Sequence, residues 1–157
     1  SNAKHLGAQA GDELRLAAMP SLKSSVSATA EKAGTAQLDC DATALTVKDG
    51  VITSCYIDSL QAKVEFGTDG VITKGVSSAV ETKNQLGERY GMVAWGGAIA
   101  EWNEQAASFA SYITGKTAAQ VAGIAVDAGT KPTGADLVSS VTIAIGGFQA
   151  LIAKAAQ

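Results

Sequence analysis

Apolar and polar residues alternate through residues 35–48, which is the spacing of a strand with one buried face. The apolar positions are Ala36, Leu38, Cys40 and Ala42, followed by Leu45 and Val47. Alternation with a period of two predicts a strand, and the change from even to odd positions near residue 44 predicts a β-bulge. A second, more continuously apolar run begins at Val51.

The pentapeptide Asp-Gly-Val-Ile-Thr occurs twice, at 49–53 and at 69–73. An Asp-Gly pair between two apolar runs is typical of a tight hairpin turn. We therefore expect a three-stranded antiparallel meander whose middle strand runs from Val51 to Phe66. Two copies of the pentapeptide are too few to indicate a repeat protein.

Helical spacing replaces this alternation in the second half of the chain. Apolar residues recur at three- and four-residue steps at Ile99, Trp102, Ala106, Phe109 and Ile113, and again at Ile145, Phe148, Ile152 and Ala155. These stripes predict helices over about 98–114 and 140–155. A short helix is expected over 117–123 with Thr117 as its N-cap, whereas 82–92 is expected to be mostly loop.

Strands that come first and helices that come later predict an α+β fold, here a small twisted antiparallel sheet packed by two main helices. Residues 34–157 are expected to form this one domain. Residues 1–33 are expected to be a tail or linker: Ser1-Asn2-Ala3 has the composition of a cloning remnant, and 20–32 is rich in Ser, Ala and Thr. Only 13–19 has the pattern of a short strand or helix.

Composition excludes several classes of function. The net charge is −3 and no basic stripe is present, so nucleic acid is not an expected partner. No apolar run approaches the roughly 20 residues of a membrane span. One His and two Cys argue against a zinc site and against histidine acid–base catalysis.

A disulfide between the two cysteines is not expected. A two-residue turn at 49–50 would place Cys55 opposite Ala44, four strand residues or about 13 Å from Cys40. A disulfide needs Cα atoms within about 7 Å.

One segment carries candidate chemistry, Asp136-Leu137-Val138-Ser139-Ser140-Val141-Thr142. It supplies three hydroxyl groups and, at the expected start of the last helix, free backbone N–H groups. Such a position binds anions, phosphate especially. The alternative for the same residues is a simple helix cap.

This segment resembles the C-terminal signature of the FMN-binding domain family, Asp-x-x-Ser/Thr-Gly-Ala-Thr. Asp136, Ser139 and Thr142 match, whereas Ser140 stands where the family has Gly and Val141 where it has Ala. A weaker similarity extends over about 35–157, in the order of hairpins, aromatic helix and signature. The chain is also similar to uncharacterised surface or lipoprotein-like proteins of gram-positive anaerobes.

The resemblance implies that a separate flavin transferase attaches FMN to Thr142 through a phosphoester bond, using FAD and Mg²⁺. Asp136 and Ser139 would shape the loop presented to that transferase. The domain would be an extracytoplasmic electron carrier without catalytic activity of its own, serving an unidentified redox partner and tethered to a membrane through a removed N-terminus. Because Ser140 and Val141 differ from the signature, there is a second hypothesis: the domain is a flavin-free module that binds a small molecule or a protein.

Other side chains are candidates for contact with a ligand. Trp95, in the Gly-rich stretch 91–97, is positioned to stack on a flavin ring or simply to anchor the loop, while Trp102 is expected in the core. A polar cluster precedes this stretch: Glu81, Lys83, Asn84, Glu88 and Arg89. This cluster is either a solvated surface or the wall of a cleft facing the terminal motif.

Overall fold

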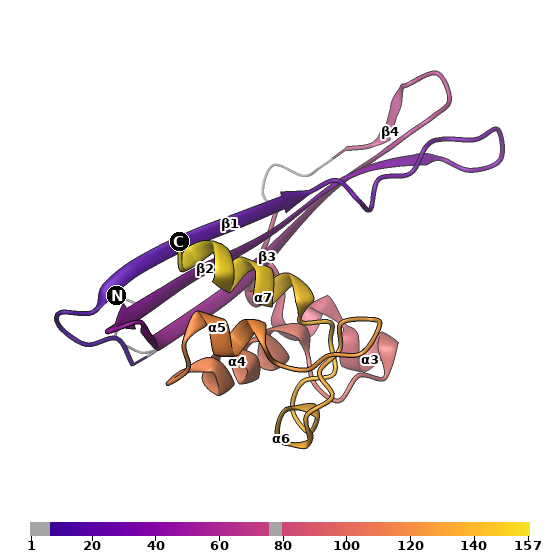
Figure 1. The fold of residues 1–157 in the computed structure, drawn as a ribbon. Helices are drawn as coiled ribbons and strands as arrows, with labels where there is room; N and C mark the ends of the chain where they lie inside the picture. Colours follow the sequence, from indigo (N-terminus) through magenta and orange to yellow (C-terminus); the bar gives the residue numbers. More distant parts are fainter. Residues whose placement is uncertain (1–6, 76–79) are drawn as a thin grey trace.

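A long twisted sheet has its helices gathered against one face (Figure 1). The computed structural model describes residues 7–75 and 80–157. The elements are β1 (Glu13–Ser21), β2 (Gly34–Lys48), β3 (Val51–Phe66), β4 (Ile72–Lys74), α2 (Lys83–Leu86), η1 (Gly87–Tyr90), α3 (Met92–Gly96), α4 (Trp102–Ile113), α5 (Ala118–Ala122), α6 (Ala135–Val138) and α7 (Gly146–Ala155). The expected α+β class is confirmed.

The sheet is antiparallel, with the strand order β1-β2-β3-β4. The predicted meander is present as β2, β3 and β4. Asp49 and Gly50 have φ angles of 52° and 78°, the left-handed pair that a two-residue hairpin turn requires. The part of the sheet near β4 extends beyond the helices (Figure 1).

Part of the segment expected to be a tail is a strand of the sheet. β1 pairs with β2 from Glu13 opposite Val47 to Ser21 opposite Asp39, so the sheet begins well before residue 34. The segment 13–19 was expected to be a short strand or helix, and it is a strand; the sequence did not decide between the two because the solvent face is also apolar, Leu14 and Leu16 being 60% and 70% exposed. A strand with apolar residues on both faces shows no alternation.

The bulge lies a little further along than expected, between Thr46 and Val47. It shifts the register so that Cys55 faces Leu45 rather than Ala44. Both cysteines are free, as expected.

The core lies between the sheet and the helices α4, α5 and α7. Its largest fully buried side chains are Phe109, Leu45, Ile113, Leu137, Ile145, Leu151, Ile152, Gln105, Val121 and Val141. The ring of Phe148 on α7 lies 5.8 Å from that of Trp102 and 5.4 Å from that of Phe109, both on α4. Trp102 is therefore a core residue, as expected.

Both long helices begin later than predicted. α4 starts at Trp102 because the buried Glu101 carboxylate accepts hydrogen bonds from the N–H groups of Met92 and Val93 (2.9 and 3.0 Å), which turns the chain just before the helix. Ile99 consequently lies outside the helix and is 56% exposed. α7 starts only at Gly146.

The short elements agree with the sequence in part. Thr117 caps α5 by accepting a hydrogen bond from Gln120 N–H at 3.2 Å, as predicted. The expected loop over 82–92 instead forms α2, η1 and the start of α3, because Thr82 and Gln85 make a capping box. Among the described residues, no helix is both long and apolar enough to cross a membrane.

Candidate functional site

The candidate motif is divided between α6 and the loop that follows it, residues 139–145, which we call the motif loop. Asp136 lies in α6, whereas Ser139, Ser140 and Thr142 lie in or at the start of the motif loop. Because α7 begins only at Gly146, the hydroxyl groups do not lie at the N-terminus of the last helix. The expected placement at a helix start was wrong.

A buried glutamine holds the motif loop. Gln105 on α4 is fully buried, and its Oε1 accepts hydrogen bonds from Thr142 N (2.8 Å), Thr142 Oγ1 (3.3 Å) and Ile143 N (3.2 Å). Its Nε2 donates to the carbonyl of Ala100 at 2.8 Å. The N–H groups of Thr142 and Ile143 are therefore satisfied within the protein and are not free for an anion.

Sequence reasoning missed Gln105 by assigning it to the polar side of its helix, although it stands three residues after Trp102 and four before Phe109, on the buried face. A polar residue beside a stripe normally faces solvent, so only the contact with the motif loop, 37 residues away, reveals its role. Its spacing from Trp102 and Phe109 is a local signal that it lies on the buried face.

The two departures from the family signature are accommodated in the structure. Val141 is fully buried, so its side chain occupies the core rather than the surface beside Thr142. Ser140 is not among the residues with positive φ, so this position does not need the conformational freedom of Gly. Thr142 itself is half-buried.

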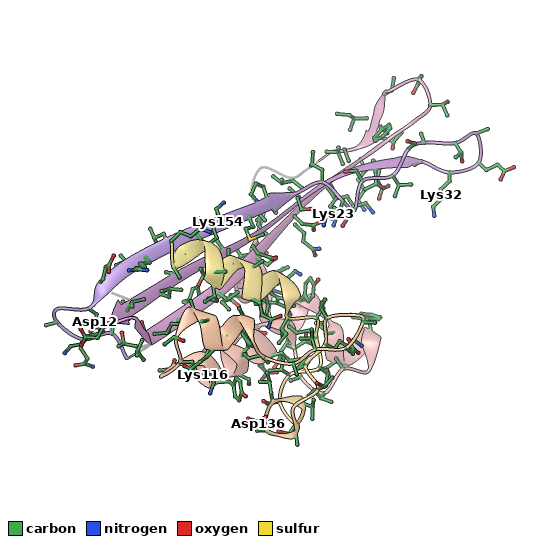
Figure 2. All side chains as sticks on the ribbon, in the orientation of Figure 1. Asp12, Lys23, Lys32, Lys116, Asp136 and Lys154 are labelled. Carbon is green, nitrogen blue, oxygen red and sulfur yellow. The ribbon has the colours of Figure 1, made fainter. Side chains whose placement is uncertain are left out.

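Asp136 has a partner outside the motif loop. Its carboxylate accepts a hydrogen bond of 2.9 Å from the hydroxyl of Tyr112, and Lys116 Nζ lies 4.5 Å from the centre of the Tyr112 ring. These three side chains line a small cleft of about 300 Å³ beside α6. Figure 2 shows Asp136 at the end of the molecule furthest from the sheet.

The hydrogen bond to Asp136 raises the pKa of Tyr112, and partial burial and the carboxylate charge act in the same direction. We expect Asp136→Asn to lower the pKa of Tyr112 back toward 10, the ordinary value for tyrosine. A pH titration of tyrosinate absorbance measures the change, and Tyr112→Phe assigns the signal among the three tyrosines. Because the folded pKa is raised, the stabilisation is complete below pH 10 and is lost as the pH rises through the folded value. An unchanged titration in Asp136→Asn would mean that the two groups do not interact in solution.

Trp95 is separate from the motif. Its side chain is 88% exposed and one edge of the indole lies over Gly91, where a Cβ would collide with it. No hydrogen bond or aromatic contact among the described residues joins Trp95 to the motif loop.

The polar cluster at 81–89 divides between surface and cleft. Glu81 and Arg89 form an exposed ion pair. Lys83 Nζ lies 5.0 and 4.9 Å from the ring centres of Tyr90 and Trp102.

Asn84 of the same cluster lines a cleft, though not one beside the motif. This cleft, which we call the β3–α4 cleft, measures about 450 Å³. Its lining residues are Cys55, Tyr56, Ile57, Asn84, Asn103, Ala107, Ala110, Ser111 and Thr114. At 100° per residue, the side chains that α4 gives to this cleft lie on the side of the helix opposite Gln105. The β3–α4 cleft and the motif loop are therefore two separate places on the molecule.

Neither a metal-binding arrangement among the described residues nor a similarity to known proteins indicates a ligand for these two places. Within the described residues, no group of three or more His, Cys, Asp or Glu side chains is arranged to hold a metal ion. No family model, no curated protein and no solved structure matches this chain.

Proposed function

We propose that this domain is an extracytoplasmic electron carrier to which FMN is attached through a phosphoester bond at Thr142. The proposal rests on the signature Asp136, Ser139 and Thr142. The observation that carries it is the state of Thr142, a half-buried residue whose hydroxyl makes, among the described residues, a single long hydrogen bond of 3.3 Å to Gln105. The flavin, when bound, would supply the electron-transfer chemistry.

Attachment at Thr142 requires little change in the chain. The Thr142 oxygen would form a bond to the FMN phosphorus as the pyrophosphate bond of FAD breaks, AMP leaves, and the hydroxyl proton passes to the transferase or to solvent. Only the hydroxyl hydrogen bond to Gln105 would be lost. The bonds from Thr142 N and Ile143 N to Gln105 involve other atoms and would continue to hold the motif loop.

The same geometry limits what the protein offers to the phosphate. Because Gln105 already accepts hydrogen bonds from the N–H groups of Thr142 and Ile143, an attached phosphate would gain none from them and would remain in contact with water. Covalent attachment, rather than a preformed phosphate pocket, would then retain the flavin. Free FMN is accordingly expected to bind weakly.

The test is to incubate the domain with a flavin transferase, FAD and Mg²⁺ and to measure intact mass and in-gel flavin fluorescence. We expect a gain of one FMN moiety in the unaltered chain and in Thr133→Ala, a matched change at an exposed threonine. Thr142→Ala should gain nothing. Absence of any gain in the unaltered chain would overturn the proposal and favour the alternative, a flavin-free binding module.

A further inference from the structure

We propose that the β3–α4 cleft binds a small uncharged molecule that carries an amide group. This site is distinct from Thr142 and does not depend on flavin attachment. Its size, about 450 Å³, lies within the usual range for small-molecule sites. Three features of its lining point to the chemistry of the ligand.

The first feature is an unsatisfied acceptor. Asn103 Oδ1 is shielded from solvent and has no hydrogen-bond partner among the described residues, and Asn103 lines the cleft. A buried polar atom without a partner is unfavourable, because it has lost its hydrogen bonds to water and gained none in the protein. Asn103 is itself partly exposed, so a turn of its side chain would bring this oxygen to a ligand N–H or O–H group in the cleft and give it a partner.

The second feature is an unpaired stretch on the outer edge of β3. Ile52 on this edge bonds through its N–H and C=O to the carbonyl of Lys116 and the N–H of Gly115. Further along, the carbonyl of Ile57 accepts a hydrogen bond of 2.9 Å from Asn84 Nδ2. Between them lies Cys55, two residues before Ile57, so the alternation of a strand points its N–H and C=O to the same side as those of Ile57. The bulge opposite Thr46 and Val47 explains why Ile52, three residues before Cys55, also faces this edge.

No residue outside the sheet bonds to these two groups of Cys55 in the part of the chain that the structure describes. The cleft therefore presents a donor and an acceptor from the backbone of Cys55 and an acceptor from Asn103. An amide carries the complementary pair, an N–H donor beside a C=O acceptor.

The third feature is the absence of charge. Among the lining residues that the structure describes, none is Asp, Glu, Lys, Arg or His, and Ile57, Ala107 and Ala110 supply an apolar wall. An ionised ligand would lose its hydration there without gaining a counter-charge. The lining therefore favours a neutral amide with an aliphatic group over a free amino acid.

The probe is N-acetyl-leucinamide, titrated into the folded domain while backbone amide shifts are followed by NMR. We expect saturable shifts at Cys55 and along the cleft side of α4. Free leucine, which carries two charges at neutral pH, should bind at least about tenfold more weakly, the change that corresponds to about 1.4 kcal/mol.

Two variants test the site directly. Asn103→Leu should weaken binding by about tenfold or more. Ala107→Leu should weaken it to the same extent, because the larger side chain fills the cleft. If one of the two variants folds poorly, the other still tests the site. Ser108→Leu, a polar-to-leucine change on the same helix outside the lining, should bind as the unaltered chain does. Thr142→Ala should also bind normally, which separates this inference from the flavin proposal.

The inference would be overturned by an absence of saturable shifts, by shifts located away from the cleft, or by equal affinity in Asn103→Leu and Ala107→Leu. Equal binding of free leucine would overturn the assignment to uncharged amides. Asn103→Leu also has an expected effect on the unliganded protein. Because it removes a buried acceptor without a partner, it should raise the urea midpoint of unfolding, so that the variant gains stability while it loses the ligand.

Discussion

Replacing Gln105 with leucine is expected to lower the free energy of unfolding by about 3 kcal/mol. Leucine fits the same volume but neither accepts nor donates hydrogen bonds. The N–H groups of Thr142 and Ile143 and the carbonyl of Ala100 would lose their partner. Each of these three unsatisfied groups costs about 1–3 kcal/mol, and their sum is the upper limit of the expected loss in free energy of unfolding. Water can reach the half-buried loop and bond to these groups, which reduces the loss.

Urea denaturation followed by tryptophan fluorescence measures this loss, and limited proteolysis reports where it acts. Cleavage within 139–145 should become faster in Gln105→Leu than in the unaltered chain. Gln120→Leu is the matched control, because Gln120 is exposed and its side-chain oxygen accepts a hydrogen bond from Thr117 N–H at the start of α5. It should cost no more than about 1 kcal/mol. A similar small loss in Gln105→Leu would mean that the motif loop does not depend on this side chain.

The sheet was largely accessible from the sequence because its signals are local. The repeated Asp-Gly turns and the alternation beyond Thr35 predicted β2, β3 and the meander. β1 was expected only as a short strand or helix over 13–19, because its pairing partners lie 18 to 34 residues away along the chain and its exposed face carries Leu14 and Leu16. Where both faces of a strand are apolar, only the pairing identifies it.

The starts of the two long helices illustrate a different limit. In each case a buried polar side chain makes hydrogen bonds across the fold close to the expected start of the helix. Glu101, which directly precedes α4, accepts hydrogen bonds from the N–H groups of Met92 and Val93. Gln105 similarly holds the segment before α7 in an irregular conformation. Apolar periodicity cannot report such contacts, because they are made by polar atoms across the fold.

The sequence predicted which segment holds the candidate site, but not which residues the side chains of that segment contact. The motif identified residues 136–142, yet in the structure Asp136 accepts a hydrogen bond from Tyr112 and Thr142 donates one to Gln105. The β3–α4 cleft could not be predicted, because it depends on where α4 lies against the edge of β3. Asn103 has no distinguishing neighbour in sequence, and its unsatisfied oxygen is visible only in three dimensions.

The second large effect is expected from Phe148→Ala, which should lower the free energy of unfolding by about 4 kcal/mol. Phe148 is 4% exposed and contacts both Trp102 and Phe109. Its removal leaves a cavity between α4 and α7 and also ends two aromatic contacts, each worth about 0.5–1.5 kcal/mol beyond the buried area. Such a loss is a large share of the roughly 5–15 kcal/mol that stabilises a typical domain.

Urea denaturation of Phe148→Ala should give a lower midpoint, together with altered fluorescence from Trp102. Phe148→Leu retains most of the buried volume and should cost less than about 1.5 kcal/mol. Phe66→Ala makes the same chemical change at the end of β3, where the ring is only half-buried, and should cost less than Phe148→Ala. If the two alanine variants lost equal stability, Phe148 would not be the contact that joins the helices. If Phe148→Ala alone is severe, the position of α7, and with it the end of the motif loop, depends on this aromatic contact.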